Sequence, residues 1–347
     1  MEAKTPQLTS NSSDLINTIL GQIDKEREKE IISRRFGLFD RKETLEQIGE
    51  MLGITRERVR QLEKTILLKV RAIAGTKKIT DFTNFETEII SNLSSNGGLL
   101  NISQLTETVV GNKDKIEQSR MTFIALLSDK LVVLNENDLY FTSVALKDEF
   151  SEKNLMTSID KLVKTIADSG EPCNIKQLVS LTGNSNEKQL SSLANCSKLL
   201  ASLNDHWGLI KWPTVNPKNI RDKIYVILKE NGKQMHFNEI SDSIKKSDFK
   251  RKDVTTQAIH NELIKDKRFV LVGRGIYALK EWGFSKGTVS DVISKILKEA
   301  KKPLHKDDIV KSVLKDRFVK ETTILLNLQN KSKFKRVAKA TYDINEK

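Results

Sequence analysis

The sequence predicts a mainly α-helical protein built from several small units. A chain of 347 residues is too long to fold around one small hydrophobic core, and domains of ordinary size would divide it into two to five compact units. Hydrophobic residues make up 38% and charged residues 30%, whereas aromatic residues make up only 6% and five prolines occur. This composition disfavours a sandwich or barrel of aromatic strands joined by Pro/Gly turns.

The N-terminal part predicts a long amphipathic helix. Residues 1–12 are polar and rich in Ser, Thr and Asn, which is typical of a frayed end. From Asp14 onward, apolar residues recur at every third or fourth position, and a mixed-charge run at 25–30 carries the pattern into Ile31. We expect one helix with a charged exposed face, ended by Gly37.

Capping signals predict two further helices joined by a short turn. Thr44 can cap the first helix while Gln47 reaches back in a capping box. Gly53 allows the tight turn, and Thr55 can cap the helix that follows. The residues expected to face inward are Leu45, Ile48, Leu52, Val59, Leu62 and Ile66.

The exposed face of the second of these helices is basic and rich in bidentate groups. It carries Arg56, Glu57, Arg60, Gln61 and Lys64 at spacings that bring them side by side. In a DNA major groove Arg can bridge guanine O6 and N7, Glu can accept from cytosine N4, and Gln can pair with adenine. Many surface helices are polar and basic. The pairing of two helices with a Gly-containing turn favours a DNA-reading helix-turn-helix.

The same stretch carries a family resemblance. RFGL, followed by TLEQIGEMLGITRERVRQLEK, resembles region 4 of the bacterial sigma-70 family over residues 14–72. The resemblance implies a cytoplasmic bacterial protein that binds double-stranded DNA at a promoter −35 element and docks on the flap of the RNA polymerase β subunit. It assigns base contacts to Arg56, Glu57, Arg60 and Gln61. It places Thr44 and Arg58 near the DNA backbone, and Lys64 extends the same basic face.

One departure from that family bears on function. A complete sigma factor carries an aromatic-rich region 2, which melts the −10 element, upstream of region 4. Here only the polar residues 1–12 precede the first expected helix. We therefore do not expect this chain to open promoters by the usual route.

From residue 80 onward one order of elements recurs, with three helices followed by a β-hairpin at a period of about 65 to 69 residues. This is the order of a winged helix. The predicted fold is mainly α, with an N-terminal helix-turn-helix followed by about four tandem winged-helix domains with short β-hairpin wings. The expected boundaries are 1–79, 80–150, 151–215, 216–284 and 285–347. The hairpin of 151–215 is the least distinct, and a plain helical linker is the alternative there.

The third unit carries a second resemblance. GKQMHFNEISDSI, followed by IHNELIKDKRFVLVGRGIYALKEWG, is similar to the HARE-HTH family of winged helices over residues 220–283. That family appears in the delta subunit of bacterial RNA polymerase and fused to DNA-acting or chromatin proteins. Arg274 lies at the hairpin tip between two glycines, where it would reach a phosphate or a minor groove. An ordinary turn residue is the alternative.

The net charge of +13 is concentrated at the two ends of the chain. It is +4 for residues 1–79, −6 for 80–150, 0 for 151–210, +7 for 211–282 and +8 for 283–347. The last hairpin holds Lys333, Lys335 and Arg336, which suit non-specific binding to the DNA backbone. A solvated basic surface is the alternative. The acidic segment would repel DNA and suits a spacer or a polymerase-facing unit.

The sequence holds no recognisable catalytic or metal motif. It has no P-loop, Rossmann glycine run, GxSxG or HExxH, and its four histidines are scattered. Cys173 and Cys196 form no CxxC, so reduced structural thiols are expected. No apolar run has signal-peptide or membrane-span length. We expect no enzyme activity, no cofactor and no membrane association.

The leading interpretation is a sigma-like DNA-binding transcription factor that reads a −35-type sequence through the helix at 55–72. One alternative is an accessory or adaptor subunit of RNA polymerase, similar to delta, that acts through protein contacts. Another is a DNA-reading accessory subunit of a restriction or modification system. The sequence leaves open the target promoters, activation against repression, the regulating signal and the oligomeric state.

Overall fold

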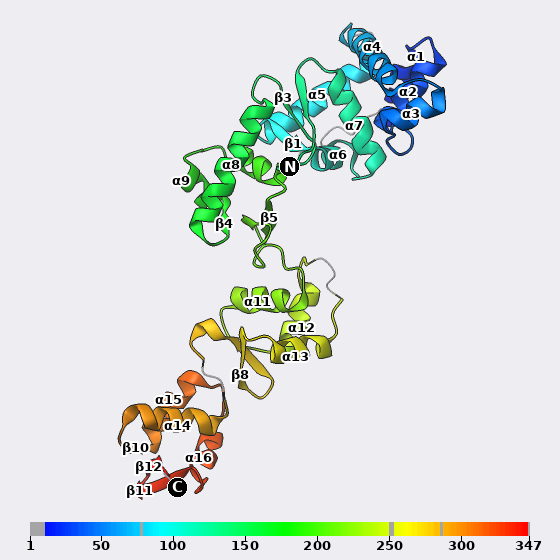
Figure 1. Cartoon of the computed structure of the whole chain (residues 1–347). Helices are drawn as coiled ribbons and strands as arrows, with labels where there is room; N and C mark the ends of the chain where they lie inside the picture. The colour runs from blue at the N-terminus through cyan, green and yellow to red at the C-terminus, as the bar shows by residue number, and fades with distance from the viewer. Residues whose placement is uncertain (1–10, 77–78, 250–252, 285–286, 346–347) are drawn as a thin grey trace, which may run out of the picture. The chain divides into compact units, whose positions relative to one another are not determined.

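The computed structural model describes residues 11–76, 79–249, 253–284 and 287–345 (Figure 1). It is mainly helical, with small antiparallel sheets, and the chain divides into two compact units, residues 1–211 and 212–347. None of the described helices has the length and apolar character that a membrane span requires.

The first unit begins with four helices, of which the last two form a helix-turn-helix. They are α1 (Ser12–Gly21), α2 (Glu26–Phe36), α3 (Leu45–Leu52) and α4 (Arg56–Gly75). The single long helix expected before Gly37 is wrong, because the chain breaks between α1 and α2. Gly21 is a poor helix former, and α1 ends where the backbone N–H of Gln22 donates to the carbonyl of Ile19 and that of Ile23 to the carbonyl of Leu20.

Two sets of elements with the same order complete the first unit. The first set is α5 (Thr80–Ser95), β1 (Leu99–Asn101), α6 (Ile102–Val110), α7 (Lys115–Leu127), β2 (Leu131–Leu134) and β3 (Ser143–Leu146). The second is α8 (Glu152–Ser169), β4 (Cys173–Asn174), α9 (Ile175–Thr182), α10 (Glu187–Cys196), β5 (Leu200–Leu203) and β6 (His206–Leu209). Residues 151–210 therefore contain a sheet, and the all-helical alternative for them is wrong.

The second unit repeats this order twice. The first set is α11 (Ile220–Asn231), β7 (Met235–His236), α12 (Phe237–Lys246), α13 (Thr256–Lys265), β8 (Phe269–Gly273) and β9 (Ile276–Leu279), followed by the 3₁₀ turn η1 (Lys280–Trp282). The second is α14 (Val289–Ala300), β10 (Leu304–His305), α15 (Lys306–Asp316), α16 (Glu321–Leu328), β11 (Phe334–Ala338) and β12 (Thr341–Ile344).

Each set builds a three-stranded antiparallel sheet rather than the two-stranded hairpin expected from the sequence. The sheet orders are β1-β3-β2, β4-β6-β5, β7-β9-β8 and β10-β12-β11. The last strand of each set lies in the middle and pairs with a short strand that precedes the second helix of the set. These extra strands tie the hairpin to the helices.

One hydrophobic core joins the helix-turn-helix to the segment after it. The core runs from Leu15 in α1 to Val144 in β3, and the Phe36 ring lies 5.1 Å from the Phe123 ring. Arg120 of α7 donates to the carbonyl of Leu38 over 2.8 Å. The boundary expected at residue 79 thus lies inside a continuous core.

Candidate nucleic-acid interface

The turn between α3 and α4 is set by two caps and a left-handed glycine. Thr44 and Gln47 form the predicted capping box at the start of α3, with hydrogen bonds of 2.9 and 3.2 Å. Gly53 ends α3 with φ of 64°, where a side chain would be strained. Thr55 then caps α4 by accepting from the Arg58 N–H over 3.2 Å. These local signals confirm the predicted turn.

Gly49 is a residue of this turn that the sequence reasoning missed. A Cβ at position 49 would lie 2.7 Å from the carbonyl oxygen of Ile54, which is closer than side-chain atoms come to backbone. Ile54 also donates its N–H to the Gly49 carbonyl over 2.9 Å. A glycine inside a helix costs up to about 1 kcal/mol of stability relative to alanine. Its occurrence in the middle of α3 was therefore the sequence signal that the backbone is closely approached there.

The candidate reading face of α4 lies open to solvent. The side chains predicted to contact DNA from this helix are all exposed: Arg56, Glu57, Arg58, Arg60, Gln61 and Lys64. The opposite face is buried through Val59, Ile66 and Val70, as expected of an amphipathic helix on a core. Arg56 and Arg58 also line a shallow open depression of about 660 Å³ beside α3.

Two of the predicted base-contacting residues pair with each other. Arg60 donates to both carboxylate oxygens of Glu57, over 2.9 Å from Nε and 2.7 Å from Nη2. These hydrogen bonds hold the pKa of Glu57 below its usual value and raise the pKa of Arg60. Both groups are solvent-exposed, so water and salt screen the ion pair. Either side chain can therefore leave the pair for another partner at little cost in free energy. Gln61 likewise accepts from Arg58 over 3.3 Å.

Contacts from α2 and α7 hold the helix-turn-helix from behind. Arg35 of α2 forms a half-buried ion pair with Glu63 of α4 over 3.0 Å, and Arg27 donates to the carbonyl of Leu52 at the end of α3 over 2.9 Å. Farther along, Arg71 donates to the carbonyl of Leu126 at the end of α7. The segment after residue 79 therefore contacts the rear and C-terminal part of α4 and leaves the N-terminal turns uncovered.

The remaining predicted DNA contacts lie in the second unit. Arg274 is exposed at the turn between β8 and β9. Lys335 and Arg336 are exposed on β11, and Arg336 donates to the carbonyl of Ala338 over 3.1 Å. Lys333 is exposed but pairs with Asp291 over 3.2 Å, which offsets its charge.

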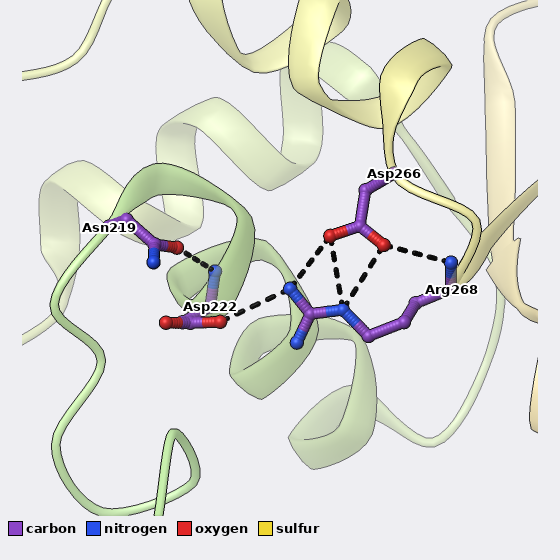
Figure 2. Close-up of polar contacts among 4 residues, drawn as sticks. All are labelled: Asn219, Asp222, Asp266 and Arg268. Atoms are coloured by element: carbon purple, nitrogen blue, oxygen red, sulfur yellow. Dashed lines mark hydrogen bonds and ion pairs between the residues drawn. The ribbon is translucent and has the colours of Figure 1, made fainter. Parts of the chain in front are cut away.

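Arg268 forms a structural network that the sequence did not point to. Figure 2 shows its guanidinium between Asp222 at the start of α11 and Asp266 after α13, at 3.1 and 2.8 Å. Asn219 caps α11 by accepting from the Asp222 N–H over 2.9 Å. These carboxylates join the start of α11 to the end of α13 in the first set of elements of the second unit. Arg268 keeps the pKa of Asp266 below its usual value.

The described residues hold no cluster of three His, Cys, Asp or Glu side chains that could bind a metal ion. Cys173 and Cys196 are free and buried, as expected of structural thiols. Burial raises the pKa of Cys196 to about 12, so it is a poor nucleophile at neutral pH.

The comparison with known proteins bears on the helix-turn-helix. A family model of sigma-70, region 4, matches residues 25–72. The match begins just before α2 and covers α3, the turn and most of α4. RNA polymerase sigma factor SigA from a Bacillus species is 40% identical over 76 residues, and SigA from Listeria monocytogenes is 38% identical over 76 residues. The alignments cover 22% of this chain and 19% of each relative. The chain thus spans about a fifth of the length of the relatives it matches.

Proposed function

We propose that the protein is a sigma-like DNA-binding transcription regulator that reads a −35-type sequence with α4. The observation that carries the proposal is the exposed, preformed row of Arg56, Glu57, Arg60 and Gln61 on a helix-turn-helix that matches sigma-70 region 4. The row stands on the N-terminal turns of α4, the part of a recognition helix that enters the major groove. Thr44, Arg58 and Lys64 flank it and contact phosphates.

The role is binding rather than catalysis. RNA polymerase is the proposed partner, with the flap of the β subunit as the docking element. We further propose that the four sets of three helices and a three-stranded sheet are winged-helix domains, and that residues 220–283 form a HARE-HTH domain. Arg274, Lys335 and Arg336 then add backbone contacts whose strength falls with salt.

A second candidate function is a polymerase accessory subunit that acts through protein contacts alone. The net charge of −6 in residues 80–150 favours it, because this segment would repel DNA. The two candidates are separated by one pair of measurements. An accessory subunit would co-elute with core polymerase and fail to shift duplex DNA at moderate salt.

Selection of bound sequences from random duplex DNA tests the leading proposal. The wild type is compared with the double variant Arg60→Ala, Gln61→Ala, both of whose substitutions lie on the exposed face. We expect the wild type to enrich a TTGAC-like core and the double variant to lose it, while salt-sensitive binding persists. Matched control substitutions at Lys298, exposed in the second unit, should keep the motif. A wild type that enriches no motif would show that α4 does not read bases.

A further inference from the structure

A groove in the second unit combines an apolar lining with basic groups. It has a volume of about 1040 Å³ and lies between the β8–β9 hairpin and the segment that joins α15 to α16. Three of its lining side chains are large, apolar and about half exposed: Leu271 at 50%, Leu314 at 47% and Phe318 at 58%. Exposed apolar residues gathered at one site mark a surface that a partner covers.

The floor of the groove holds a buried cation. Arg317 is only 3% exposed, and its guanidinium donates to the carbonyls of Leu271 and Gly287. Its Nε has no hydrogen-bond partner. Within the described parts of the chain, no carboxylate forms an ion pair with Arg317. Burial lowers its pKa, and the nearby charges of Asp316 and Asp291 oppose that effect only in part. A buried cation without an ion-pair partner is costly, and a carboxylate brought to it would relieve that cost.

The charge around the groove points in the same direction. Arg274 and Lys320 also line it, and none of the described residues that line it is acidic. DNA would satisfy the charges but not the apolar side chains, because a phosphate backbone has no large apolar groups to bury. The occupant that matches both is a protein segment with acidic and large apolar residues close together.

We propose that this groove docks a segment of a partner protein in which an Asp or Glu stands beside two or more large apolar side chains. The apolar side chains cover Leu314 and Phe318, and the carboxylate faces the basic floor. The outer edge of β8 is already engaged, because the Phe318 N–H donates to the Val272 carbonyl over 2.9 Å. Side-chain contacts rather than an added strand therefore hold the segment.

The test is a selection of random 12-residue peptides displayed on phage against the full chain. We expect enriched peptides in which Asp or Glu lies within a few positions of Leu, Ile or Phe. One enriched peptide, labelled with a fluorophore, is then titrated with the protein while its anisotropy is followed. Replacing its acidic residue with Lys should weaken binding by at least about tenfold, the loss typical of a central interface residue.

Variants of the groove locate the binding site. Phe318→Ser and Leu314→Ser change exposed side chains, so they should preserve the fold while weakening the peptide by about tenfold or more. Ile264→Ser, equally exposed on α13 and outside the groove, is the matched control. Lys320→Glu should weaken the acidic peptide, whereas Lys298→Glu on α14 should not. Arg317 is left unchanged because its hydrogen bonds join two parts of the unit.

Three outcomes would overturn the proposal. They are a selection without an acidic and apolar consensus, peptide binding that the groove variants leave intact, and duplex DNA binding that these variants weaken in place of peptide binding. The last result would identify the groove as a DNA surface. The double variant at Arg60 and Gln61 should bind the peptide as the wild type does, so this test and that of the proposed DNA reading fail independently.

Discussion

Replacing Phe123 with alanine asks whether the helix-turn-helix folds alone or together with the segment after it. Phe123 of α7 is fully buried, its ring lies 5.1 Å from that of Phe36, and it shares a core with α1 and α4. Truncating a buried Phe to Ala costs about 3–5 kcal/mol of unfolding free energy. That cost lowers the folded-to-unfolded ratio by roughly two to nearly four orders of magnitude.

Hydrogen exchange followed by mass spectrometry reads this change segment by segment. Because one core spans both segments, we expect amides in peptides from residues 45–72 to exchange faster by about the factor that the free-energy change sets. The acceleration should appear more than 50 residues away in sequence from the substitution. Leu178→Ala, at a buried position of α9 outside this core, is the matched control and should accelerate exchange mainly around α9.

A response confined to the substituted segment would show that the two segments fold separately. If Phe123→Ala accelerates exchange in residues 115–134 and leaves residues 45–72 at the wild-type rate, the helix-turn-helix is an independent domain. The boundary expected at residue 79 would then be a true folding boundary. If the two segments unfold together, Phe123→Ala should also weaken sequence-specific DNA binding. If the helix-turn-helix folds alone, its DNA binding should stay at the wild-type level.

Three further predictions concern single residues. Gly49→Ala should destabilise the helix-turn-helix by about 1–3 kcal/mol in urea melts, because the added Cβ meets a carbonyl at 2.7 Å, whereas Gly75→Ala, with open space around it, should be neutral or slightly stabilising. Arg60→Lys keeps the charge but loses the two-pronged contact with guanine and with Glu57. It should blur one position of the selected DNA motif and leave the salt dependence of binding nearly unchanged. Hydrogen bonds from Thr288 hold the pKa of Asp291 at about 2, below its ordinary value of 3.8, so its stabilising effect is present above pH 4 and lost as the pH falls toward 2. The urea midpoints of wild type and Asp291→Asn should therefore differ at pH 5 and converge as the pH falls through 3.

The sequence was sufficient where structure depends on neighbouring residues. The capping box at Thr44, the cap at Thr55 and the left-handed glycines at 37 and 53 are formed by groups within five residues of one another. The order of helices and hairpins after residue 80 also followed from local periodicity. The exposed row on α4 was predictable for the same reason, since one face of an amphipathic helix is visible in the spacing.

The sequence was insufficient where structure depends on distant residues. Strands such as β7 and β10 have two residues, too few to show an alternating pattern, and exist because a distant strand pairs with them. The packing of Phe36 on Phe123 likewise joins chain segments that no period connects. The break after Gly21 was hidden because the apolar spacing continues across it.

The repeated sets of elements share one sheet order but not one charge. Apolar positions and short strands set the topology, so exposed charge can change from −6 in residues 80–150 to +8 in residues 283–347 without altering the fold. On the proposed function, sequence reading rests with α4 and the basic C-terminal part adds salt-dependent affinity. Each phosphate neutralised adds about 0.9 to the slope of log affinity against log salt. If the affinity of this protein for DNA falls steeply with salt and it selects no sequence motif, it therefore binds DNA through residues 212–347 instead of α4.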